Sequence, residues 1–298
     1  MLVPKIKSQL QHQESSRPLI IGISGLQGSG KSTWASRMVE VLETQHQLHA
    51  ITLSLDDLYK THDHLVAQRD RDPQNKLYQT RGQPGTHDEA LAANLFDKLR
   101  NYHGQSQGDD DDDVMLRIPR FDKSRFNGEG DRAPEAEWPI LRRRPDVVVF
   151  EGWCLGFQPL SPAALAAKYE QARAGRLGVN TPAAHAMPHL LAINDSLQRY
   201  CESFMGAEHF DFFVHLDTTD LRNVYGWRLQ QEHDMIEARG TGMPDEQVRA
   251  FIDGYMPSYE MYLDGLRKGL VGGRFGEKGR MVRVVLDRER RVEVIEEV

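Results

Sequence analysis

The segment GISGLQGSGKST, residues 22–33, contains the pattern G-x-x-x-x-G-K-S at residues 25–32. An apolar, β-branched run at residues 19–24 precedes it and predicts a buried strand. At residues 31–45 apolar side chains recur at helical spacing, which predicts a helix. A glycine-rich turn between a strand and a helix is typical of a phosphate-binding loop, and the complete pattern favours such a loop over an ordinary turn.

Each residue type in this loop has a chemical use. Glycines let the backbone curl so that successive N–H groups point at phosphates, and the following helix adds the positive end of its dipole. Lys31 is expected to reach the β- and γ-phosphates and to act in catalysis, and Ser32 is expected to bind Mg²⁺. The expected ATP-binding residues are Gly25, Leu26, Gln27, Gly28, Ser29, Gly30, Lys31, Ser32 and Thr33.

The nucleotide base is a separate question. GTPases of the Ras type carry an N-K-x-D motif that reads guanine. The N-K pair of this chain, at residues 75–76, is followed by Leu77 and Tyr78 and lacks the aspartate. ATP is therefore the expected nucleotide.

Two adjacent aspartates, Asp56 and Asp57, follow a predicted strand at residues 49–54. Ligands of an open α/β sheet sit at the carboxyl ends of the strands, so either acid is placed near the γ-phosphate. A carboxylate there can accept the proton of an attacking hydroxyl and orient it in line. Aspartates also cap turns and helices, and the spacing alone leaves both uses open for both residues.

Glu151 directly follows the apolar run at residues 146–150, DVVVF, which predicts a third strand. An acid at this point in a chain with a phosphate loop stands at the Walker-B position, where it can hold Mg²⁺ through water. The alternative is an acid that is merely exposed at the end of a strand. The expected contacts of Mg²⁺ are thus Ser32, Asp56 and Glu151.

The other patterns complete an α/β fold. Thr86 and Glu89 predict a capping box before a helix at residues 91–99. Further strands are expected at 210–216 and 280–286, and further helices at 161–175, 220–238 and 245–270. Strands that alternate with helices, several of them wholly apolar, indicate a parallel sheet with helices on both faces and a helical lid.

The domain organisation follows from composition along the chain. Residues 19–298 show no break and predict a single domain, whereas the polar residues 1–17 predict a flexible tail. Residues 105–113, QSQGDDDDD, contain five consecutive aspartates. Such a run repels itself and cannot be buried, so it predicts a solvated acidic loop insert.

The overall composition limits the class of protein. The 298 residues are 39% hydrophobic and 27% charged, as in soluble globular proteins. The net charge of −7 gives no basic excess for nucleic acid, and no apolar run is long enough to span a membrane. Two distant cysteines and an N-terminus without an apolar signal core predict a cytoplasmic protein. Nothing in the pattern indicates an oligomeric state.

Six blocks of the sequence together resemble one known family. They are GISGLQGSGKST at 22–33, SLDDLYKTHD at 54–63, RGQPGTHD at 81–88, PRFDKSRFNGEGDRA at 119–133, VVFEGWCLGFQPL at 148–160 and YGWRLQQE at 225–232. This set resembles the D-glycerate 3-kinase family of plants and its fungal relatives, within the phosphoribulokinase, uridine kinase and pantothenate kinase group. The resemblance implies a P-loop NTPase-type fold and transfer of the γ-phosphate of ATP, with Mg²⁺, onto D-glycerate to give 3-phosphoglycerate.

The resemblance also assigns roles to residues. It implies that Asp56, the first acid of its block, is the catalytic aspartate, and it supports Glu151 as a site residue. Two loop blocks offer donors for the carboxylate of a small anionic substrate, namely Arg81, His87, Arg120 and Lys123. Arg228 lies in the stretch that resembles the lid and is expected to neutralise charge in phosphoryl transfer. Each of these cations is alternatively an ordinary surface residue.

Two departures from the plant pattern fall in the loops expected to hold the substrate. Pro84 and the pair Phe121-Asp122 stand where plant members have other residues. The competing hypotheses are therefore a kinase of the same group with another small substrate, such as a nucleoside or a pantothenate-like acid, and an ATP-dependent switch or assembly factor without a metabolite substrate.

Overall fold

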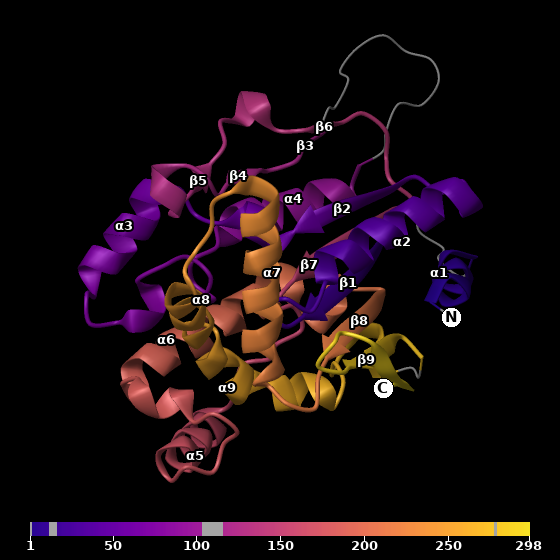
Figure 1. Ribbon diagram of the computed structural model, residues 1–298. Coiled ribbons are helices and arrows are strands. Elements are labelled where there is room, and N and C mark those ends of the chain that lie inside the picture. The colour runs from indigo at the N-terminus through magenta and orange to yellow at the C-terminus, as the bar shows by residue number, and fades with distance from the viewer. Residues whose placement is uncertain (1, 12–16, 103–115, 277–278) are drawn as a thin grey trace.

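The computed structural model describes residues 2–11, 17–102, 116–276 and 279–298. Its centre is a six-stranded sheet in the order β10-β9-β8-β1-β7-β2, with helices packed around it (Figure 1). Neighbouring strands from β9 to β2 are parallel, and β10 runs antiparallel to β9 at the edge. The strands of this sheet are β1 (Leu19–Gly25), β2 (Ala50–Ser54), β7 (Val147–Gly152), β8 (Phe212–Asp217), β9 (Met281–Leu286) and β10 (Val292–Glu297).

Helices cover both faces of the sheet. On β7, Phe150 contacts Phe96 of α4, with ring centroids 4.9 Å apart, while the next side chain, Glu151, receives a hydrogen bond from Ser32 of α2. Because successive side chains of a strand point to opposite faces, α2 and α4 lie on opposite faces. The α-helices are α1 (Leu2–Gln11), α2 (Lys31–His46), α3 (His62–Arg71), α4 (Glu89–Arg100), α5 (Pro162–Arg173), α6 (Met187–Tyr200), α7 (Asn223–Arg239), α8 (Asp245–Asp253) and α9 (Met256–Arg267).

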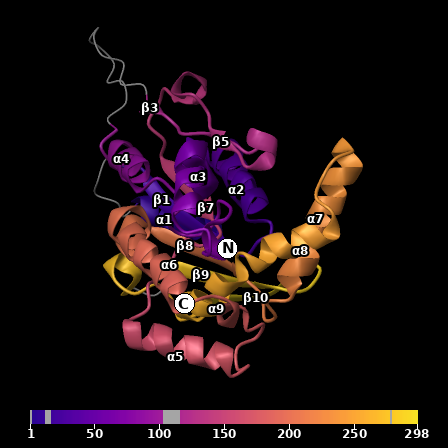
Figure 2. The same cartoon turned by 90° about the vertical axis from the view of Figure 1, so that its left-hand side faces the viewer.

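Two small hairpin-like pairs lie outside the main sheet. The strand β3 (Leu116–Arg117) pairs with β6 (Ile140–Leu141), and β4 (Phe121–Asp122) pairs with β5 (Asp131–Arg132). The second pair belongs to a loop that we call the acceptor loop, residues 119–133. Figure 2 shows one end of α7 projecting beyond the other elements on the side where α8 lies.

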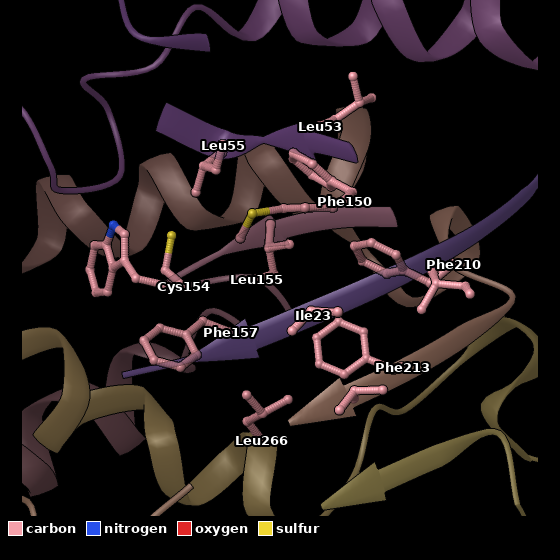
Figure 3. Packing of buried hydrophobic residues seen from close by; sticks show 14 of the residues in the cluster. Ile23, Leu53, Leu55, Phe150, Cys154, Leu155, Phe157, Phe210, Phe213 and Leu266 are labelled. Atoms are coloured by element: carbon pink, nitrogen blue, oxygen red, sulfur yellow. The ribbon is translucent and has the colours of Figure 1, made fainter. Parts of the chain in front are cut away.

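Aromatic side chains pack against β1, which passes between β7 and β8. The rings of Phe150, Phe210 and Phe213 (Figure 3) lie on the face of β1 to which Gly22 points, opposite the side chain of Ile23. Gly22 of β1 has no room for a side chain, since a Cβ atom there would lie 2.5 Å from the Phe213 ring and 2.9 Å from the Phe210 ring. The packing of the Phe213 and Phe210 rings over the backbone of β1 therefore depends on a glycine.

The predicted fold class is confirmed, because the sheet is mostly parallel and flanked by helices. The five strands predicted from apolar runs are present, and Ser161 caps α5 through a bond from the Ala164 N–H at 3.3 Å. The edge strand β10 was not predicted, since its alternating sequence VEVIEE is exposed throughout and lacks an apolar run.

The N-terminal segment differs from the flexible tail that its polarity predicts. Residues 2–11 form α1, in which Ile6 is fully buried and Val3 and Leu10 pack against the core. These three apolar residues recur at helical spacing and make a narrow stripe that the surrounding polar residues obscure. Lys5 also pairs with Glu297 of β10 at 2.7 Å.

The predicted capping box was wrong. Asp88 is the N-cap of α4, and its carboxylate accepts from the Leu91 N–H at 3.0 Å. The Thr86 hydroxyl instead donates to the Gln83 carbonyl at 2.7 Å, within the turn before the helix. The expected helix at 245–270 is two helices, because α8 stops at Asp253 and α9 begins at Met256 with a proline in its first turn.

Two further predictions concern the acidic loop insert and membrane-spanning helices. The acidic run at 105–113 lies outside the described residues. Across the described part of the chain, no helix combines the length and the apolar character needed to cross a membrane.

A substitution in β1 tests the packing of the core. Gly22→Ala is expected to lower the free energy of unfolding by about 1–3 kcal/mol, because the buried rings of Phe210 and Phe213 must shift to admit a methyl group. Urea denaturation followed by tryptophan fluorescence measures this change. In the control Gly265→Ala, an exposed site in α9 with no atom within 4 Å of the added Cβ, stability should stay equal or rise. Equal effects of the two variants would contradict the packing argument.

Candidate active site

The carboxyl ends of β1, β7 and β2 meet at one cavity of about 380 Å³. The register of the sheet pairs Ser24 with Gly152 and Ser54 with Glu151, so the three strands end side by side. The cavity is lined by the phosphate loop, the two strand ends, the acceptor loop, α7 and the turn after β9. The lining residues are Gln27, Gly28, Gly30, Lys31, Ser32, Thr33, Ser54, Asp56, Lys123, Glu151, Trp153, Gln231, Asp234 and Arg290.

The phosphate loop joins β1 to α2 and is shaped by two glycines. Gly28 and Gly30 have φ angles of 77° and 85°, a left-handed backbone that other residues rarely adopt. A Cβ atom on Gly28 would also lie 2.8 Å from Trp227 of α7. The Gln27 N–H donates to the Tyr259 hydroxyl at 3.0 Å. The loop is therefore packed against both α7 and α9.

Glu151 is positioned by hydroxyl groups of the neighbouring elements. Its Oε1 atom accepts from Ser32 Oγ at 3.1 Å and from Ser54 Oγ at 2.9 Å. The residue is 8% exposed, and its Oε2 atom is buried without a hydrogen-bond partner among the described residues. A buried carboxylate oxygen without a partner is costly, and a cation is one group that would satisfy it.

This arrangement fits Mg²⁺ accompanying ATP. Carboxylate and hydroxyl oxygens are ligands that Mg²⁺ prefers, and Ser32 and Glu151 present both kinds at the start of the helix that follows the loop. Within the described ranges, no three His, Cys, Asp or Glu residues gather as a metal cluster. Mg²⁺ at such sites commonly keeps water and takes phosphate oxygens as its other ligands.

The two adjacent aspartates have different surroundings. Asp56 lines the cavity, where Tyr59 Oη donates to its Oδ1 at 3.0 Å and Lys123 Nζ lies 2.5 Å from its Oδ2. Asp57 turns toward the acceptor loop and accepts from the Phe121 N–H at 3.0 Å. Asp56 is therefore the acid placed for chemistry, and Asp57 holds the loop that carries Lys123.

The charge of Asp56 is set by two opposing effects. Burial raises the pKa of its carboxyl group, but Lys123 and then Lys31 outweigh burial and lower that pKa to about 2. Burial raises the pKa of Tyr59 well above its usual value, so the phenol keeps its proton. Asp56 is thus an ionised carboxylate that receives one hydrogen bond from a permanent donor.

His87 lies beneath this acid and belongs to the core. It is fully buried, its ring stacks on Tyr59 with centroids 4.4 Å apart, and its Nδ1 atom is 3.0 Å from Tyr200 Oη. Burial lowers the pKa of His87 to about 3, so the imidazole is neutral near neutral pH. A neutral ring in this place supports Tyr59 and brings no positive charge to a substrate carboxylate.

The predicted substrate-binding cations divide into two groups. Lys123 lines the cavity, and Arg120 of the same loop is exposed. Arg81 donates to the carbonyls of Gly128 and Glu129 and lies over the Phe121 ring at 5.4 Å. Arg81 thereby holds the acceptor loop in place.

Arg228 does not line the cavity. Its guanidinium pairs with Glu232 at 2.5 Å and lies over the Phe251 ring of α8 at 5.5 Å. The residues of α7 that line the cavity are Gln231 and Asp234, and the turn after β9 adds Arg290. Because Arg290 lies beyond the last predicted strand, in a turn without a motif, no signal in the sequence marked it as a site residue.

A phosphate loop between a parallel strand and a helix, with acids at the ends of two adjacent strands, defines a P-loop kinase. The chain is 36% identical over 269 residues to "Uncharacterized kinase mug58" of Schizosaccharomyces pombe, which covers 89% of each chain. It also superposes on the solved structure of a D-glycerate 3-kinase from Cryptococcus neoformans with a TM-score of 0.86 and 34% identity, covering 100% of this chain and 98% of that one. The chain belongs to the D-glycerate 3-kinase family, and the enzyme is an ATP-dependent kinase.

Two further relatives agree with this membership. The chain is 36% identical to "Probable ATP-dependent kinase TDA10" of Saccharomyces cerevisiae over 83% of its length and 78% of that protein. It is 30% identical to "D-glycerate 3-kinase, chloroplastic" of Arabidopsis thaliana over 95% of its length and 56% of the plant protein. No protein-family model matches the chain.

A change at Glu151 tests the Mg²⁺ site. Glu151→Gln keeps the size of the side chain and removes its charge, so the Mg²⁺ concentration that gives half-maximal ATP binding should rise about tenfold. Isothermal calorimetry with a nonhydrolysable ATP analogue over a range of Mg²⁺ concentrations measures this shift. The matched control Glu135→Gln removes an exposed carboxylate outside the cavity lining and should bind as wild type. An unchanged Mg²⁺ requirement in Glu151→Gln would exclude Glu151 from the metal site.

Proposed function

We propose that this kinase transfers the γ-phosphate of ATP to the 3-hydroxyl of D-glycerate in the cytoplasm, with Mg²⁺ accompanying the nucleotide. The observation that carries the proposal is the placement of Asp56 between the phosphate loop and Lys123 at a single cavity. The names of two relatives, the Cryptococcus and Arabidopsis D-glycerate 3-kinases, support glycerate as the acceptor. The position phosphorylated follows from those names alone.

The phosphate loop and its lysine hold the donor. Lys31 lines the cavity beside Ser32 and is proposed to contact the β- and γ-phosphates and to neutralise charge as the phosphoryl group moves. The backbone N–H groups at residues 25–33 are proposed to bind the phosphate chain. Ser32 and Glu151 would hold Mg²⁺, which would neutralise phosphate charge when bound.

Asp56 is proposed to receive the hydroxyl of the acceptor. Its Oδ1 atom is occupied by the Tyr59 hydroxyl, so the substrate hydroxyl would bind at Oδ2 in place of Lys123. The pKa of about 2 belongs to Asp56 paired with Lys123, so departure of Lys123 from Oδ2 raises the basicity of the carboxylate, and its first task is to orient the hydroxyl in line with the γ-phosphate. The proton passes to Asp56 as the new O–P bond forms and the bond from the γ-phosphorus to the bridging oxygen breaks, which releases ADP.

Lys123 is proposed to bind the carboxylate of the substrate. Its side chain is 57% exposed and carried on a loop, so its ammonium group can turn from Asp56 to a second carboxylate at little cost. Arg120 is proposed to assist from the same loop, and Arg81 to keep that loop in position. The predicted direct roles of His87 in substrate binding, of Asp56 as a metal ligand and of Arg228 in catalysis receive no support from the contacts of these residues.

The substrate and the catalytic aspartate can be tested together. Purified protein with Mg²⁺ and ATP should release ADP when D-glycerate is added, and not with L-glycerate, uridine, pantothenate or ribulose 5-phosphate. Asp56→Asn should lower kcat roughly 10²- to 10⁴-fold, the usual worth of a general base, with little change in ATP affinity. Coupled detection of ADP and identification of the product by NMR measure both effects.

The control for this variant is the neighbouring acid. Asp57→Asn retains an oxygen that can accept from the Phe121 N–H, so its kcat should stay within a few-fold of wild type. An Asp56→Asn enzyme with wild-type turnover would contradict the proposed role. ADP release that no compound of the panel stimulates would contradict glycerate as the acceptor and leave the kinase class unchanged.

The role of Lys123 predicts a loss of discrimination against neutral substrates. Lys123→Met should raise KM for D-glycerate about tenfold or more, since a charged hydrogen bond to the substrate carboxylate is lost, while KM for ATP stays similar. Activity with glycerol, which has no carboxylate, should fall much less. Initial-rate kinetics with both acceptors measure the ratio, and Lys98→Met on the exposed face of α4 serves as control. An unchanged preference for D-glycerate over glycerol would assign the carboxylate to another residue.

A further inference from the structure

The turn between β9 and β10 brings a cation into the cavity of the phosphate loop. Arg290 lines this cavity although it lies 262 residues along the chain from Gly28, and its side chain is only partly exposed. Figure 1 shows the C-terminal strands, drawn in yellow, lying beside one end of α7. None of the sequence motifs includes this turn, and the phosphoryl-transfer scheme above makes no use of it.

The guanidinium of Arg290 connects the phosphate loop to α7. Its Nη1 atom donates to the Gly28 carbonyl at 3.3 Å and to the Trp227 carbonyl at 3.4 Å, and its Nη2 atom donates to Gln230 Oε1 at 2.6 Å. Two of these contacts are long. The side chain is thus held at the edge of the loop, and these contacts do not use all five N–H donors of the arginine.

The backbone of the turn fixes where this side chain starts. The Arg290 N–H donates to the Asp287 carbonyl at 3.0 Å, and the Asp287 carboxylate accepts from the Arg291 N–H at 2.8 Å. Trp227 of α7 donates its indole N–H to the Arg288 carbonyl at 2.7 Å. Arg290 has a φ of 62°, a left-handed backbone in which glycine is the favoured residue. The turn thus presents a long cationic side chain at a position where glycine would meet the backbone requirement.

The other charges around the cavity indicate what the guanidinium of Arg290 could bind. Among the described residues, the cations that line the cavity are Lys31, Lys123 and Arg290, and they come from the phosphate loop, the acceptor loop and the C-terminal turn. Lys123 is paired with Asp56 on the acceptor side, and Arg228 is paired with Glu232 away from the lining. The phosphate chain of ATP needs several positive groups, and an arginine fork suits its oxygens.

We propose that Arg290 is a phosphate-binding residue for ATP, supplied by the β9–β10 turn, and that it ties α7 to the phosphate loop when the nucleotide is bound. The proposal depends on ATP as the donor and not on the identity of the acceptor. Its guanidinium bonds the phosphate chain next to Gly28, on the side of the cavity away from Lys123. Through Gln230 and Trp227 the same group holds α7 against the loop.

The test removes the guanidinium without disturbing the turn. Arg290→Gly suits the left-handed backbone, so the hairpin should still fold, although the bonds of the guanidinium to Gly28, Trp227 and Gln230 are lost. Its dissociation constant for a nonhydrolysable Mg²⁺–ATP analogue should rise about tenfold, as expected when a charged hydrogen bond is lost. Inorganic tripolyphosphate, which has no base or sugar, should lose affinity by a similar factor. Calorimetry measures binding, and thermal denaturation of the free protein measures stability.

Two further variants separate charge from geometry. Arg290→Lys keeps the charge but not the planar fork and should bind with an affinity between wild type and Arg290→Gly. Arg291→Ala removes an exposed charge from the same hairpin and should bind as wild type. In steady-state kinetics, Arg290→Gly should raise KM for ATP and leave KM for the acceptor unchanged.

The results that overturn the proposal are distinct from those that overturn the acceptor. Wild-type affinity of Arg290→Gly for both probes would show that Arg290 does not bind the nucleotide. Weaker binding of the ATP analogue with unchanged binding of tripolyphosphate would move the contact from the phosphates to the base or sugar. Equal losses in Arg290→Gly and Arg291→Ala would mean that general charge, and not this side chain, is responsible.

Discussion

The site depends on the burial of β1 between β7 and β8. Every residue of β1 is buried, and its glycine at position 22 allows the rings of Phe210 and Phe213 to pack directly on its backbone. Since the strands are parallel and in register, their carboxyl ends meet at one edge of the sheet. The packing of the core therefore sets the positions of the phosphate loop and of Glu151 at the end of β7.

Electrostatics at this edge are arranged in layers. The neutral ring of His87 lies beneath Tyr59, whose protonated hydroxyl donates to Asp56. Burial raises the pKa of Tyr59 and lowers the pKa of His87, so both groups are uncharged near neutral pH. The pKa of Asp56 is therefore lowered mainly by Lys123 and then by Lys31. One oxygen of the carboxylate accepts a hydrogen bond from Tyr59, and the other pairs with the exposed ammonium group of Lys123.

Local signals in the sequence predicted the elements in which a short run of residues determines the structure. The phosphate loop and the buried strands are of this kind, as is Glu151 at the end of β7. The spacing of residues alone could not separate Asp56 from Asp57, and only the family resemblance favoured Asp56, because the difference lies in their partners, Lys123 and the Phe121 N–H, which are more than sixty residues away. The surroundings of the Arg228 side chain could not be predicted for a similar reason. From its place in the sequence, the Arg228 side chain could point into the cavity or pair with Glu232 one turn further along α7. Its contact with Phe251 of α8 accompanies the pairing with Glu232.

The turn between β9 and β10 shows that the cavity as a whole is built from distant parts of the chain. The cations that line it among the described residues come from three elements far apart in sequence, so no segment of the chain contains the site by itself. Arg290 reaches the phosphate loop because β9 pairs in parallel with β8 and the chain then reverses into β10. The same turn accepts the Trp227 indole N–H, so the position of α7 and the position of the cation are set by one set of contacts. A movement of α7 away from the phosphate loop would therefore have to break the bonds of Arg290 to Trp227 and Gln230.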